Sequence, residues 1–418
     1  MGDGRWTGLL VKGLSLHLLL SPSPIAHRPS PNYNPAPRPA TFQCVSNFPP
    51  PDFTQPPFTS FPDASFAAAP DDGVLPDGFF STTNLPTFVR VKGRWVAPRE
   101  PRMDGGLVLD RDGTIWVREG RRLKKGDLVA VGDKEDGTQG IFVQTHMIPH
   151  GADPDAFTFM SSEVSREKPI DYAHMARVLI EEKDRGGYPI WITGPALVHS
   201  RARSDMSWFI ANGFVGALLA GNAVAVHDIE ASIYGTTLGM SATGEITQGG
   251  HGLHMRAINQ VRAAGSIAAA VEQGIITNGI MYECVKNNVP FVLTGSIRDD
   301  GPLPDVITDM LVAQDAMRRH TIKATMAIMI ATALHAIATG NMLPAYVQQP
   351  DGSMRELPTI CVDSSEFVVS KLKDRGTHQA FGVVTNAQDF MHILRLYVEK
   401  EIQTRATPAR GVAQAASR

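Results

Sequence analysis

The sequence predicts an α/β protein with a mainly parallel sheet, preceded by a smaller β-rich domain. From residue 165 onward, apolar runs of strand length alternate with segments of helical length, which is typical of βα units. Between residues 77 and 159, short β-type runs are separated by Gly, Asp and Lys turns, which indicates antiparallel strands. The chain has 418 residues, 43% of them hydrophobic, so it can bury a core in each part.

Residues 1–72 are predicted to be a disordered, proline-rich extension. The first 70 residues hold 14 of the 30 prolines and have almost no hydrophobic period. Such a segment offers too little apolar contact to offset the entropy of ordering. The apolar run from Leu9 to Leu20 is too short and too polar to span a bilayer. A secretory signal peptide and a start codon assigned too far upstream remain alternatives.

Residues 75–160 form the predicted β-rich domain, residues 165–403 the predicted α/β domain, and residues 404–418 a disordered tail. The strands expected in the small domain are Thr87–Val91, Trp95–Ala97, Gly106–Asp110, Thr114–Val117, Leu128–Val131 and Gly140–Gln144. Those expected in the parallel sheet are Pro189–Thr193, Asn222–Val226, Phe291–Thr294, Ala324–Ala331, Thr359–Val362 and Phe381–Val384. The helices expected in the α/β domain are Tyr172–Asp184, Met206–Leu219, Ser266–Asn287, Leu303–Arg319, Ser365–Lys373 and Ala387–Ile402.

Charge and cysteine content exclude several classes of function. The formal net charge is −3, and no long basic run is present, so we expect no nucleic-acid partner. The three cysteines show no CxxC or CxxH spacing, which argues against a disulfide framework or a structural zinc site. We therefore expect a cytoplasmic protein without a membrane partner.

Polar and glycine-rich turns follow the predicted strands. Because parallel strands end at one edge of their sheet, these turns are expected to meet in one crevice, where backbone N–H groups can bind phosphate. Asp363 ends a predicted strand, as does the acid that accepts ribose hydroxyls in dinucleotide enzymes. No GxGxxG motif occurs. The alternative is that the glycines only form tight turns.

The loop from Arg298 to Asp305 carries both signs of charge. As a functional loop, it uses Arg298 to bind a substrate carboxylate, and Asp299, Asp300 or Asp305 to hold an ammonium group or move a proton. The alternative is a helix-capping loop, which we favour for Asp305. Arg298 and Asp300 are the predicted catalytic residues.

Other polar residues receive structural interpretations. His227, Asp228 and Glu230 do not predict a metal site, since alternation along a strand separates the first two. His251 and His254 are secondary ligand candidates in a glycine-rich stretch. Cys284 is expected in the core.

Several long segments also match a known family. They are Phe79–Asn84, Phe159–Ser165, Leu219–Glu230, Ile280–Lys286 and Gly295–Asp305. Through them, the chain from Leu75 to about Ile402 resembles the archaeal-type NAD-dependent ornithine cyclodeaminases. This family shares the LOR/SDH region and also forms the C-terminal part of cyanobacterial arginine dihydrolase/ornithine cyclodeaminase enzymes. The sequence departs from the family pattern at His199–Arg203 and at Asn386, which leaves the identity of the substrate open.

The resemblance implies a Rossmann-like, deoxyhypusine-synthase-like NAD-binding domain and the conversion of L-ornithine to L-proline and ammonia by internal hydride transfer. It further implies a homo-oligomer that acts on a small amino-acid substrate. The cofactor contacts that it implies are Asn222, Ala223, Asp300, Thr332, Ala333, Leu334, Asn341, Met342, Leu343, Pro344, Asp363 and the turn at Phe381 and Gly382.

Two other functions remain open. One is an NAD-dependent dehydrogenase of another basic amino acid or a saccharopine-like substrate, to which Arg201 and Arg203 point. The other is a noncatalytic NAD-binding regulatory protein, because no general base can be assigned. The choice between NAD and NADP also stays open.

Overall fold

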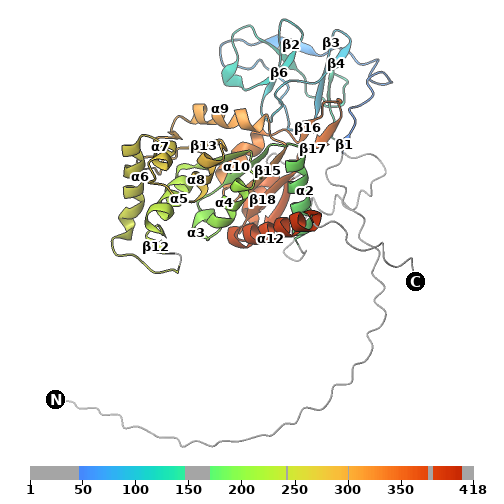
Figure 1. The fold of residues 1–418 in the computed structure, drawn as a ribbon. Coiled ribbons are helices and arrows are strands. Elements are labelled where there is room, and N and C mark those ends of the chain that lie inside the picture. The colour runs from blue at the N-terminus through green and yellow to red at the C-terminus, as the bar shows by residue number, and fades with distance from the viewer. Residues whose placement is uncertain (1–46, 146–169, 242, 300, 375–379, 407–418) are drawn as a thin grey trace, which may run out of the picture. The chain divides into compact units, whose positions relative to one another are not determined.

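The computed structural model describes residues 47–145, 170–241, 243–299, 301–374 and 380–406 (Figure 1). Asp300, one of the two predicted catalytic residues, lies outside these ranges. So do residues 1–46 of the predicted extension, the linker at 161–169, and residues 407–418.

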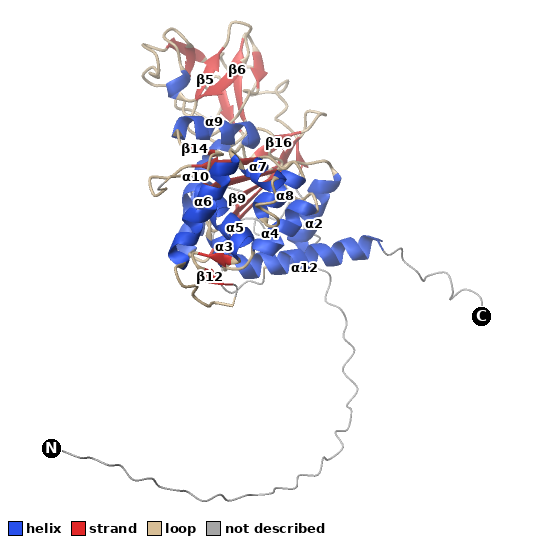
Figure 2. Cartoon of the chain, turned by 60° about the vertical axis from the view of Figure 1, so that its left-hand side comes forward, coloured by secondary structure: helices blue, strands red, loops and turns tan. Residues whose placement is uncertain are grey.

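A seven-stranded parallel sheet forms the centre of the α/β part (Figure 2). Every neighbouring pair is parallel, which confirms the predicted fold class. Apart from the short edge strand β14, the strands lie in the order 3-2-1-4-5-6, as in doubly wound dinucleotide-binding sheets. In spatial order they are β14 (Val306–Ile307), β13 (Phe291–Thr294), β10 (Ala217–Gly221), β9 (Pro189–Thr193), β15 (Met326–Ile330), β18 (Thr359–Asp363) and β19 (Ala380–Val384).

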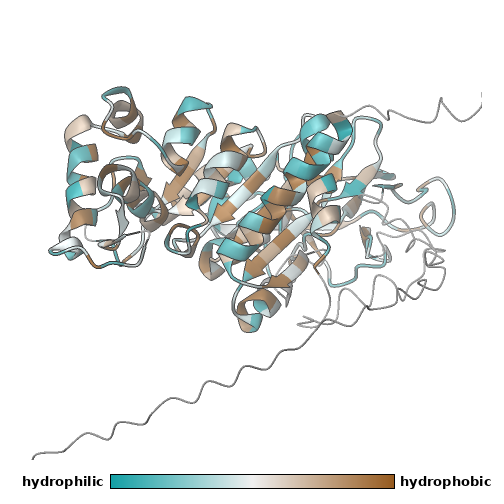
Figure 3. Cartoon of the chain, turned by 60° about the horizontal axis from the view of Figure 1, so that its bottom comes forward, coloured by the Kyte–Doolittle hydropathy of each residue, from teal (hydrophilic) through white to brown (hydrophobic). Residues whose placement is uncertain are grey.

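Helices cover both faces of this sheet, because side chains alternate along each strand. Trp191 of β9 belongs to one hydrophobic cluster, and its neighbours Ile190 and Ile192 belong to another. The helices that pack in the first cluster include α2 (Tyr172–Asp184), α4 (Arg203–Ala211), α5 (Asn222–Tyr234), α6 (Leu253–Ala264) and α12 (Ala387–Ala406). Those in the second include α9 (Met310–Thr321), α10 (Ala333–Met342) and α11 (Glu366–Asp374). All five residues of β9 and of β15 are buried, and the hydrophobic colouring of the central strands in Figure 3 shows the same property.

One predicted strand is a helix. Asn222–Val226 begins α5, and the true strand is the preceding segment, β10, which falls in the region of the helix predicted at Met206–Leu219. The apolar run through this region has no clear period, so periodicity alone cannot locate the boundary. Gly221 therefore precedes α5 as its N-cap, and does not end a helix.

Two predicted helices begin or end differently. The helix predicted at Ser266–Asn287 is divided into α7 (Ile267–Glu272) and α8 (Ile280–Lys286), because Gly279 has a φ of +107° that ordinary residues avoid. The helix predicted from Leu303 begins only at Met310, where the Asp309 side chain accepts hydrogen bonds from Leu311 N and Val312 N. Helices α6 and α10 have no counterpart among the predicted helices.

The small domain contains two antiparallel sheets, as predicted. The buried core between them includes Val89, Leu107, Ile115, Val117 and Ile141. The first sheet has the order β2-β7-β5-β6 and the second the order β4-β3-β8. Their strands are β2 (Ser65–Ala68), β7 (Leu128–Val131), β5 (Gly106–Leu109), β6 (Ile115–Arg118), β4 (Arg94–Val96), β3 (Thr87–Val91) and β8 (Ile141–Val143).

The prediction that residues 1–72 are disordered is wrong from Asn47 onward. β1 (Asn47–Phe48) pairs with β17 (Met354–Glu356), and β2 pairs with β7. The Phe53 ring stacks on Trp95 at a centroid distance of 5.2 Å. Aromatic contacts with distant residues thus supply the ordering energy that local periodicity did not reveal. The prediction of a disordered tail is also wrong for residues 404–406, which belong to α12.

We expect Phe53→Ala to lower the free energy of unfolding by about 2 to 4 kcal/mol, because it removes an aromatic ring that packs against Phe58, Phe88 and Trp95. Urea denaturation measures the change. Phe367→Ala is the matched control, since Phe367 is 68% exposed, and it should change stability by less than about 0.5 kcal/mol. Equal effects of the two substitutions would contradict the ordered packing of residues 47–72.

No helix among the described residues is long and apolar enough to cross a membrane. Cys284 and Cys361 are buried free thiols, which confirms the core position predicted for Cys284. Within the same residues, no group of His, Cys, Asp and Glu side chains is arranged to hold a metal ion.

Candidate cofactor crevice

The strand order creates a crevice at one edge of the sheet. From β9, the chain proceeds outward through β10 and β13, and then returns to place β15 on the other side of β9. The connections after β9 and β15 therefore diverge at the carboxyl ends of these two strands. In doubly wound sheets, ligands bind at such a switch point.

The backbone crosses closely at this point. Gly194, which follows β9, donates its N–H to Ile330 O at 2.9 Å, and Ala331 donates to Val362 O at 2.9 Å. A Cβ atom on Gly194 would overlap the carbonyl oxygen of Ala331. Ala331 itself has a left-handed φ of +53°, so this carbonyl is held by a constrained backbone. Only glycine fits at position 194.

The helices that follow the central strands begin without side-chain caps. Neither Gly221 before α5 nor Thr332 before α10 caps its helix with a side chain. By contrast, Asn386 Oδ1 accepts from Asp389 N at 2.8 Å at the start of α12 and so caps that helix. Free N–H groups at the starts of helices favour anions such as a pyrophosphate.

An unpaired hydroxyl group lies at the same edge. Thr193 is the last residue of β9, and its Oγ1 atom is buried without a hydrogen-bond partner among the described residues. Buried polar atoms are nearly always paired, so an orphan of this kind indicates a ligand or a water molecule. The crevice therefore has the features that a dinucleotide requires: a close glycine turn, uncapped helix starts and an available hydroxyl group.

His335 spans the carboxyl edge from the first turn of α10. Its Nε2 atom lies 2.8 Å from Thr294 Oγ1 at the end of β13. A Cβ atom on Gly221 would lie 2.9 Å from His335 Cε1, so the ring also covers the end of β10. Burial lowers the pKa of His335, which keeps its imidazole neutral near pH 7.

The structure places some of the predicted cofactor residues at this edge. Asn222 and Ala223 begin α5, and Asn222 Oδ1 accepts from Leu303 N at 3.1 Å, which fastens the loop that follows β13. Thr332, Ala333 and Leu334 begin α10, and Leu334 is 76% exposed. Asp363 ends β18, where its Oδ1 accepts from Ser365 N at 2.9 Å.

The structure separates Asn341, Met342, Leu343 and Pro344 from this edge. They end α10 and follow it, and α10 runs from the carboxyl edge to the opposite one. The next residue, Ala345, accepts a hydrogen bond from Leu357 N, just before β18 starts. This segment therefore lies at the amino ends of the strands, away from the edge where Asn222 and Thr332 begin their helices. Met342 and Leu343 are buried there.

The contacts of this segment lead to the small domain instead. Asn341 O accepts from Met103 N at 3.0 Å, and Met342 O accepts from the guanidinium group of Arg318. Arg318 Nη2 also donates to Glu100 O at 2.7 Å. Burial is the main cause that lowers the Arg318 pKa, to about 10, which still leaves it charged at neutral pH.

Phe381 and Gly382 do not form a turn. Both lie inside β19, where they pair with Ile360 and Cys361 of β18. The Val369 side chain of α11 packs so closely on Gly382 that a Cβ atom there would overlap it. The turn was implied only by the family resemblance, whereas the strand predicted at Phe381–Val384 is confirmed. The small size of Gly382 serves packing between helix and strand.

The Arg298 loop follows β13 at the carboxyl edge. Ser296 N donates to Asp299 Oδ2 at 2.7 Å, and Arg298 N donates to Ser296 Oγ at 3.2 Å. The Arg298 side chain is exposed and forms no ion pair with another described residue, so it is available to a ligand. Asp305 Oδ2 accepts from Ile267 N at 2.8 Å. The prediction that Asp305 stabilises the helix that follows it is therefore wrong, because Asp309 caps that helix. Asp305 instead binds the first N–H group of α7, whose N-cap residue is Ser266.

Asp228 has a structural role. It is fully buried on α5, where it accepts from Ile280 N at 2.9 Å and Met281 N at 2.8 Å, and pairs with Arg203 Nε at 2.6 Å. It therefore fixes the start of α8. Arg203, which pointed to another basic or saccharopine-like substrate, forms this ion pair instead.

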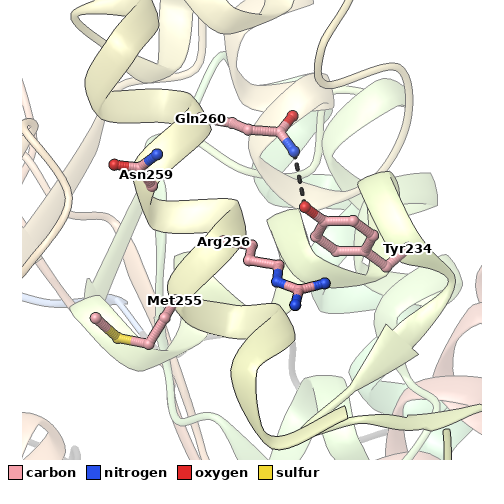
Figure 4. A pocket seen from close by; sticks show the side chains of 5 residues that line it. All are labelled: Tyr234, Met255, Arg256, Asn259 and Gln260. Atoms are coloured by element: carbon pink, nitrogen blue, oxygen red, sulfur yellow. Dashed lines mark hydrogen bonds between the residues drawn. The ribbon is translucent and has the colours of Figure 1, made fainter. Parts of the chain in front are cut away.

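A separate hollow of about 440 Å³ lies between the end of α5 and α6 (Figure 4). Tyr234, Met255, Arg256, Asn259 and Gln260 line it, and Gln260 Nε2 donates to Tyr234 OH at 2.7 Å. Tyr234 is the last residue of α5, so this hollow lies roughly 18 Å along the helix from Asn222 and the crevice. It is not part of the crevice.

Comparison with known proteins agrees with this architecture. Residues 86–173 match the first region of the arginine dihydrolase ArgZ-like C-terminal family, and residues 173–394 match its Rossmann-fold region. The chain is 46% identical over 328 residues to an ornithine cyclodeaminase from Methanopyrus kandleri, a match that covers 77% of this chain and 75% of the relative. It is 48% identical over 342 residues to one from Methanothermobacter thermautotrophicus, covering 81% and 79%.

The chain belongs to the ornithine cyclodeaminase family.

Solved structures related to the ornithine cyclodeaminase family share this fold. A LOR/SDH protein from Methanococcus maripaludis has a TM-score of 0.74 and 42% identity, and the match covers 82% of this chain and all of that one. The ternary complex of AgrE with ornithine and NAD⁺ has a TM-score of 0.51 and 36% identity. That match covers 82% of this chain and 47% of AgrE, a protein whose curated name is bifunctional arginine dihydrolase/ornithine cyclodeaminase.

Two residues of the crevice in this ornithine cyclodeaminase family member were not predicted as site residues from the sequence. Gly194 stands in a Thr-Gly-Pro turn directly after a strand whose predicted bounds are confirmed, so its position was a usable signal. Thr193 gave none, because a threonine that ends a strand is ordinary and only its lack of a partner distinguishes it.

Proposed function

We propose that this chain is an NAD-dependent ornithine cyclodeaminase that converts L-ornithine to L-proline and ammonia. The observation that carries the proposal is the crevice between β9 and β15, with its uncapped helix starts and unpaired Thr193 hydroxyl, in a chain 46 to 48% identical to ornithine cyclodeaminases. The proposal takes the enzyme to be a cytoplasmic homo-oligomer, and light scattering of the native protein tests the assembly.

The residues around the crevice fit a dinucleotide. The N–H groups that begin α5 at Asn222 and Ala223 and α10 at Ala333 and Leu334 would bind the pyrophosphate. Asp363 would accept a ribose hydroxyl group. When bound, NAD supplies a reversible hydride acceptor, so that one cofactor can both oxidise the substrate and reduce the product imine.

The substrate would lie between the crevice and the loop that follows β13. Arg298 would bind the substrate carboxylate, since its guanidinium group is exposed and forms no ion pair among the described residues. Asp300 remains our candidate for holding an ammonium group. The neutral imidazole of His335, held by Thr294, would present an N–H group or a lone pair at the centre of the edge without adding a charge.

The proposal is tested by incubating purified protein with NAD⁺ and L-ornithine labelled with ¹⁵N at the α-amino group. We expect proline and labelled ammonia to form in equal amounts, with no net accumulation of NADH, because the hydride returns to the product. The α-nitrogen should be the one released, since oxidation at the α-carbon makes it exchangeable. Retained NAD without proline or ammonia would contradict the proposal.

The same assay separates the alternatives. A dehydrogenase of another basic amino acid would accumulate NADH in proportion to its product. A noncatalytic NAD-binding protein would gain thermal stability with NAD and convert none of ornithine, lysine or saccharopine.

A further inference from the structure

Three histidines and one glutamate gather beside the crevice, and none of them has a role in the proposed function. The ring centroids of His199 and His227 are 4.5 Å apart, and those of His227 and His254 are 6.4 Å apart. His227 Nδ1 lies 3.2 Å from Glu230 Oε2. His199 ends α3 (Ala196–His199), the short helix after β9, whereas His227 and Glu230 lie on α5 and His254 on α6. We call these four residues the histidine cluster.

The cluster is close to the cofactor crevice. α3 begins two residues after Gly194, so His199 lies roughly 5 Å along this helix from the carboxyl edge. α5 also begins at this edge, with His227 in its second turn. Figures 1 and 2 both show α3 and α5 next to each other at this side of the sheet. A substrate beside the end of β9 therefore comes within reach of the cluster.

Glu230 is rigidly fixed at the back of the cluster. It is fully buried and accepts hydrogen bonds from Thr236 Oγ1, Leu238 N and Gly239 N as well as contacting His227. Burial opposes the ionisation of Glu230, yet these hydrogen bonds outweigh it and lower its pKa. An ionised carboxylate can only accept hydrogen bonds, so His227 Nδ1 donates to Glu230 Oε2, and this bond fixes the orientation of the His227 ring.

The front of the cluster carries unused hydrogen-bonding groups. His227 is only 8% exposed, whereas His199 and His254 are half-buried. His254 Nδ1 and the neighbouring Ser200 Oγ are buried without a hydrogen-bond partner among the described residues. Such orphaned atoms indicate a ligand or a water molecule. A hydroxyl group and an imidazole nitrogen can each accept a hydrogen bond, so together they can bind a ligand that donates several.

The charge of the cluster favours a cation with N–H groups. Burial lowers the pKa of His199, and the nearby His227 lowers it further, while Glu230 opposes both. The titratable groups that face His199 are thus His227 and Glu230, and His227 also faces His254 on α6. The lowered pKa keeps the His199 imidazole uncharged near neutral pH, while the Glu230 carboxylate behind it stays ionised and attracts a cation.

We propose that the histidine cluster binds the α-amino group of the amino-acid substrate. His199 and His254 would contact this group, and His227 and Glu230 would be positioning residues behind them. This inference rests on the proposed function, and it names the groups that handle the substrate nitrogen. An α-ammonium group cannot lose hydride until it has lost a proton, because the nitrogen lone pair must stabilise the cationic product.

The protons of this sequence balance as follows. A neutral imidazole takes one proton from the α-ammonium group, which gives an imidazolium ion and a free amine, and the departing ammonia later takes this proton back and leaves as ammonium. The δ-ammonium group must also lose one proton before its nitrogen closes the ring, and the proline nitrogen regains one when the hydride returns. The imidazole is then neutral again, and the hydride taken from the α-carbon has returned to the product.

Substitution tests this role with a matched control from the same segment. We expect His199→Asn and His254→Asn each to lower kcat/KM for L-ornithine by at least about 100-fold, the range for loss of a positioned acid–base group. NAD affinity, measured by calorimetry, should change by less than about two-fold. His251→Asn is the control and should leave both quantities unchanged. His251 was a secondary ligand candidate by sequence, but the structure leaves its side chain exposed and outside the ring contacts of the cluster.

The pH dependence of kcat/KM tests the positioning role of Glu230. Wild-type kcat/KM should fall at low pH as the His199 imidazole is protonated. The midpoint should lie below the ordinary histidine value because the pKa of His199 is lowered. Glu230→Gln should move that acid limb to still lower pH, since it removes the carboxylate that favours the imidazolium ion. A purely structural role of Glu230 would lower activity without moving the limb.

A binding measurement keeps the test independent of turnover and of variant folding. With NAD-loaded wild-type protein and ¹⁵N-labelled histidine, L-ornithine and 1,4-diaminobutane should shift the imidazole resonances of His199 and His254 but not that of His251. Unshifted cluster resonances, or His199→Asn and His254→Asn variants with wild-type kcat/KM, would overturn the inference and leave the proposed function intact. Failure of wild-type protein to convert ornithine would overturn the proposed function, while the resonance shifts would still decide the inference.

Discussion

Gly194→Ala should destabilise the protein by about 3 kcal/mol or more and abolish NAD binding. The added Cβ atom would overlap the Ala331 carbonyl group. This carbonyl group cannot move away easily, because Gly194 N is bonded to Ile330 O and Ala331 N to Val362 O on either side of it. Overpacking of a constrained backbone costs more than a typical surface change, and here it also distorts the cofactor crevice.

The measurement is urea denaturation together with calorimetric titration of NAD. Gly252→Ala is the matched control, because Gly252 has an ordinary φ of −95° and no atom within 4 Å of an added Cβ. It should change stability by less than about 0.5 kcal/mol and leave NAD affinity unchanged. A Gly194→Ala variant with wild-type stability and affinity would show that the two strands do not cross this closely.

Asp228→Ala should lower the free energy of unfolding by about 3 to 5 kcal/mol. The carboxylate is fully buried, and its loss leaves Arg203 without its ionic partner and the N–H groups of Ile280 and Met281 without their acceptor. Removing one member of a buried ion pair has a large cost because the remaining charge stays desolvated.

Asp184→Ala provides the comparison for this effect. Asp184 pairs with Arg405 at 3.1 Å, but its side chain is 61% exposed, so its removal should cost at most about 1 kcal/mol. Urea denaturation of both variants measures the difference. If Asp228→Ala proved as mild as Asp184→Ala, then Asp228 would not fix the start of α8, and a role in ligand binding would have to be reconsidered.

Much of the fold could be predicted from the sequence where local pattern and burial agree. The predicted bounds of β9, β13 and α2 are those of the structure, because each element has a clear apolar pattern between recognisable caps or turns. The prediction around Gly221 failed for the opposite reason. A continuous apolar run serves equally for a buried strand and a buried helix, so the division between β10 and α5 depends on the neighbours that each segment packs against.

The candidate site divides in the same way. Turns that follow parallel strands meet at one edge as a matter of sheet geometry, so the sequence alone can group Thr332 and Asp363. Asn222 came only from the family resemblance, since the strand predicted at Asn222–Val226 would have put it at the opposite end. The position of Asn341 could not be predicted, because it depends on α10 carrying the chain to the opposite edge. A segment can resemble a family motif and still lie far from the strand ends.

By itself, the sequence determined the α/β class, the two kinds of domain and the edge at which the polar turns gather. These depend on the hydrophobic pattern, which is local. Only the tertiary structure decided that Gly194 packs against the Ala331 carbonyl group and that Asp228 forms an ion pair with Arg203. It alone also decided that the rings of His199, His227 and His254 lie together. Such contacts join residues far apart in the chain, and they form only when several helices pack on one sheet, so no local pattern records them.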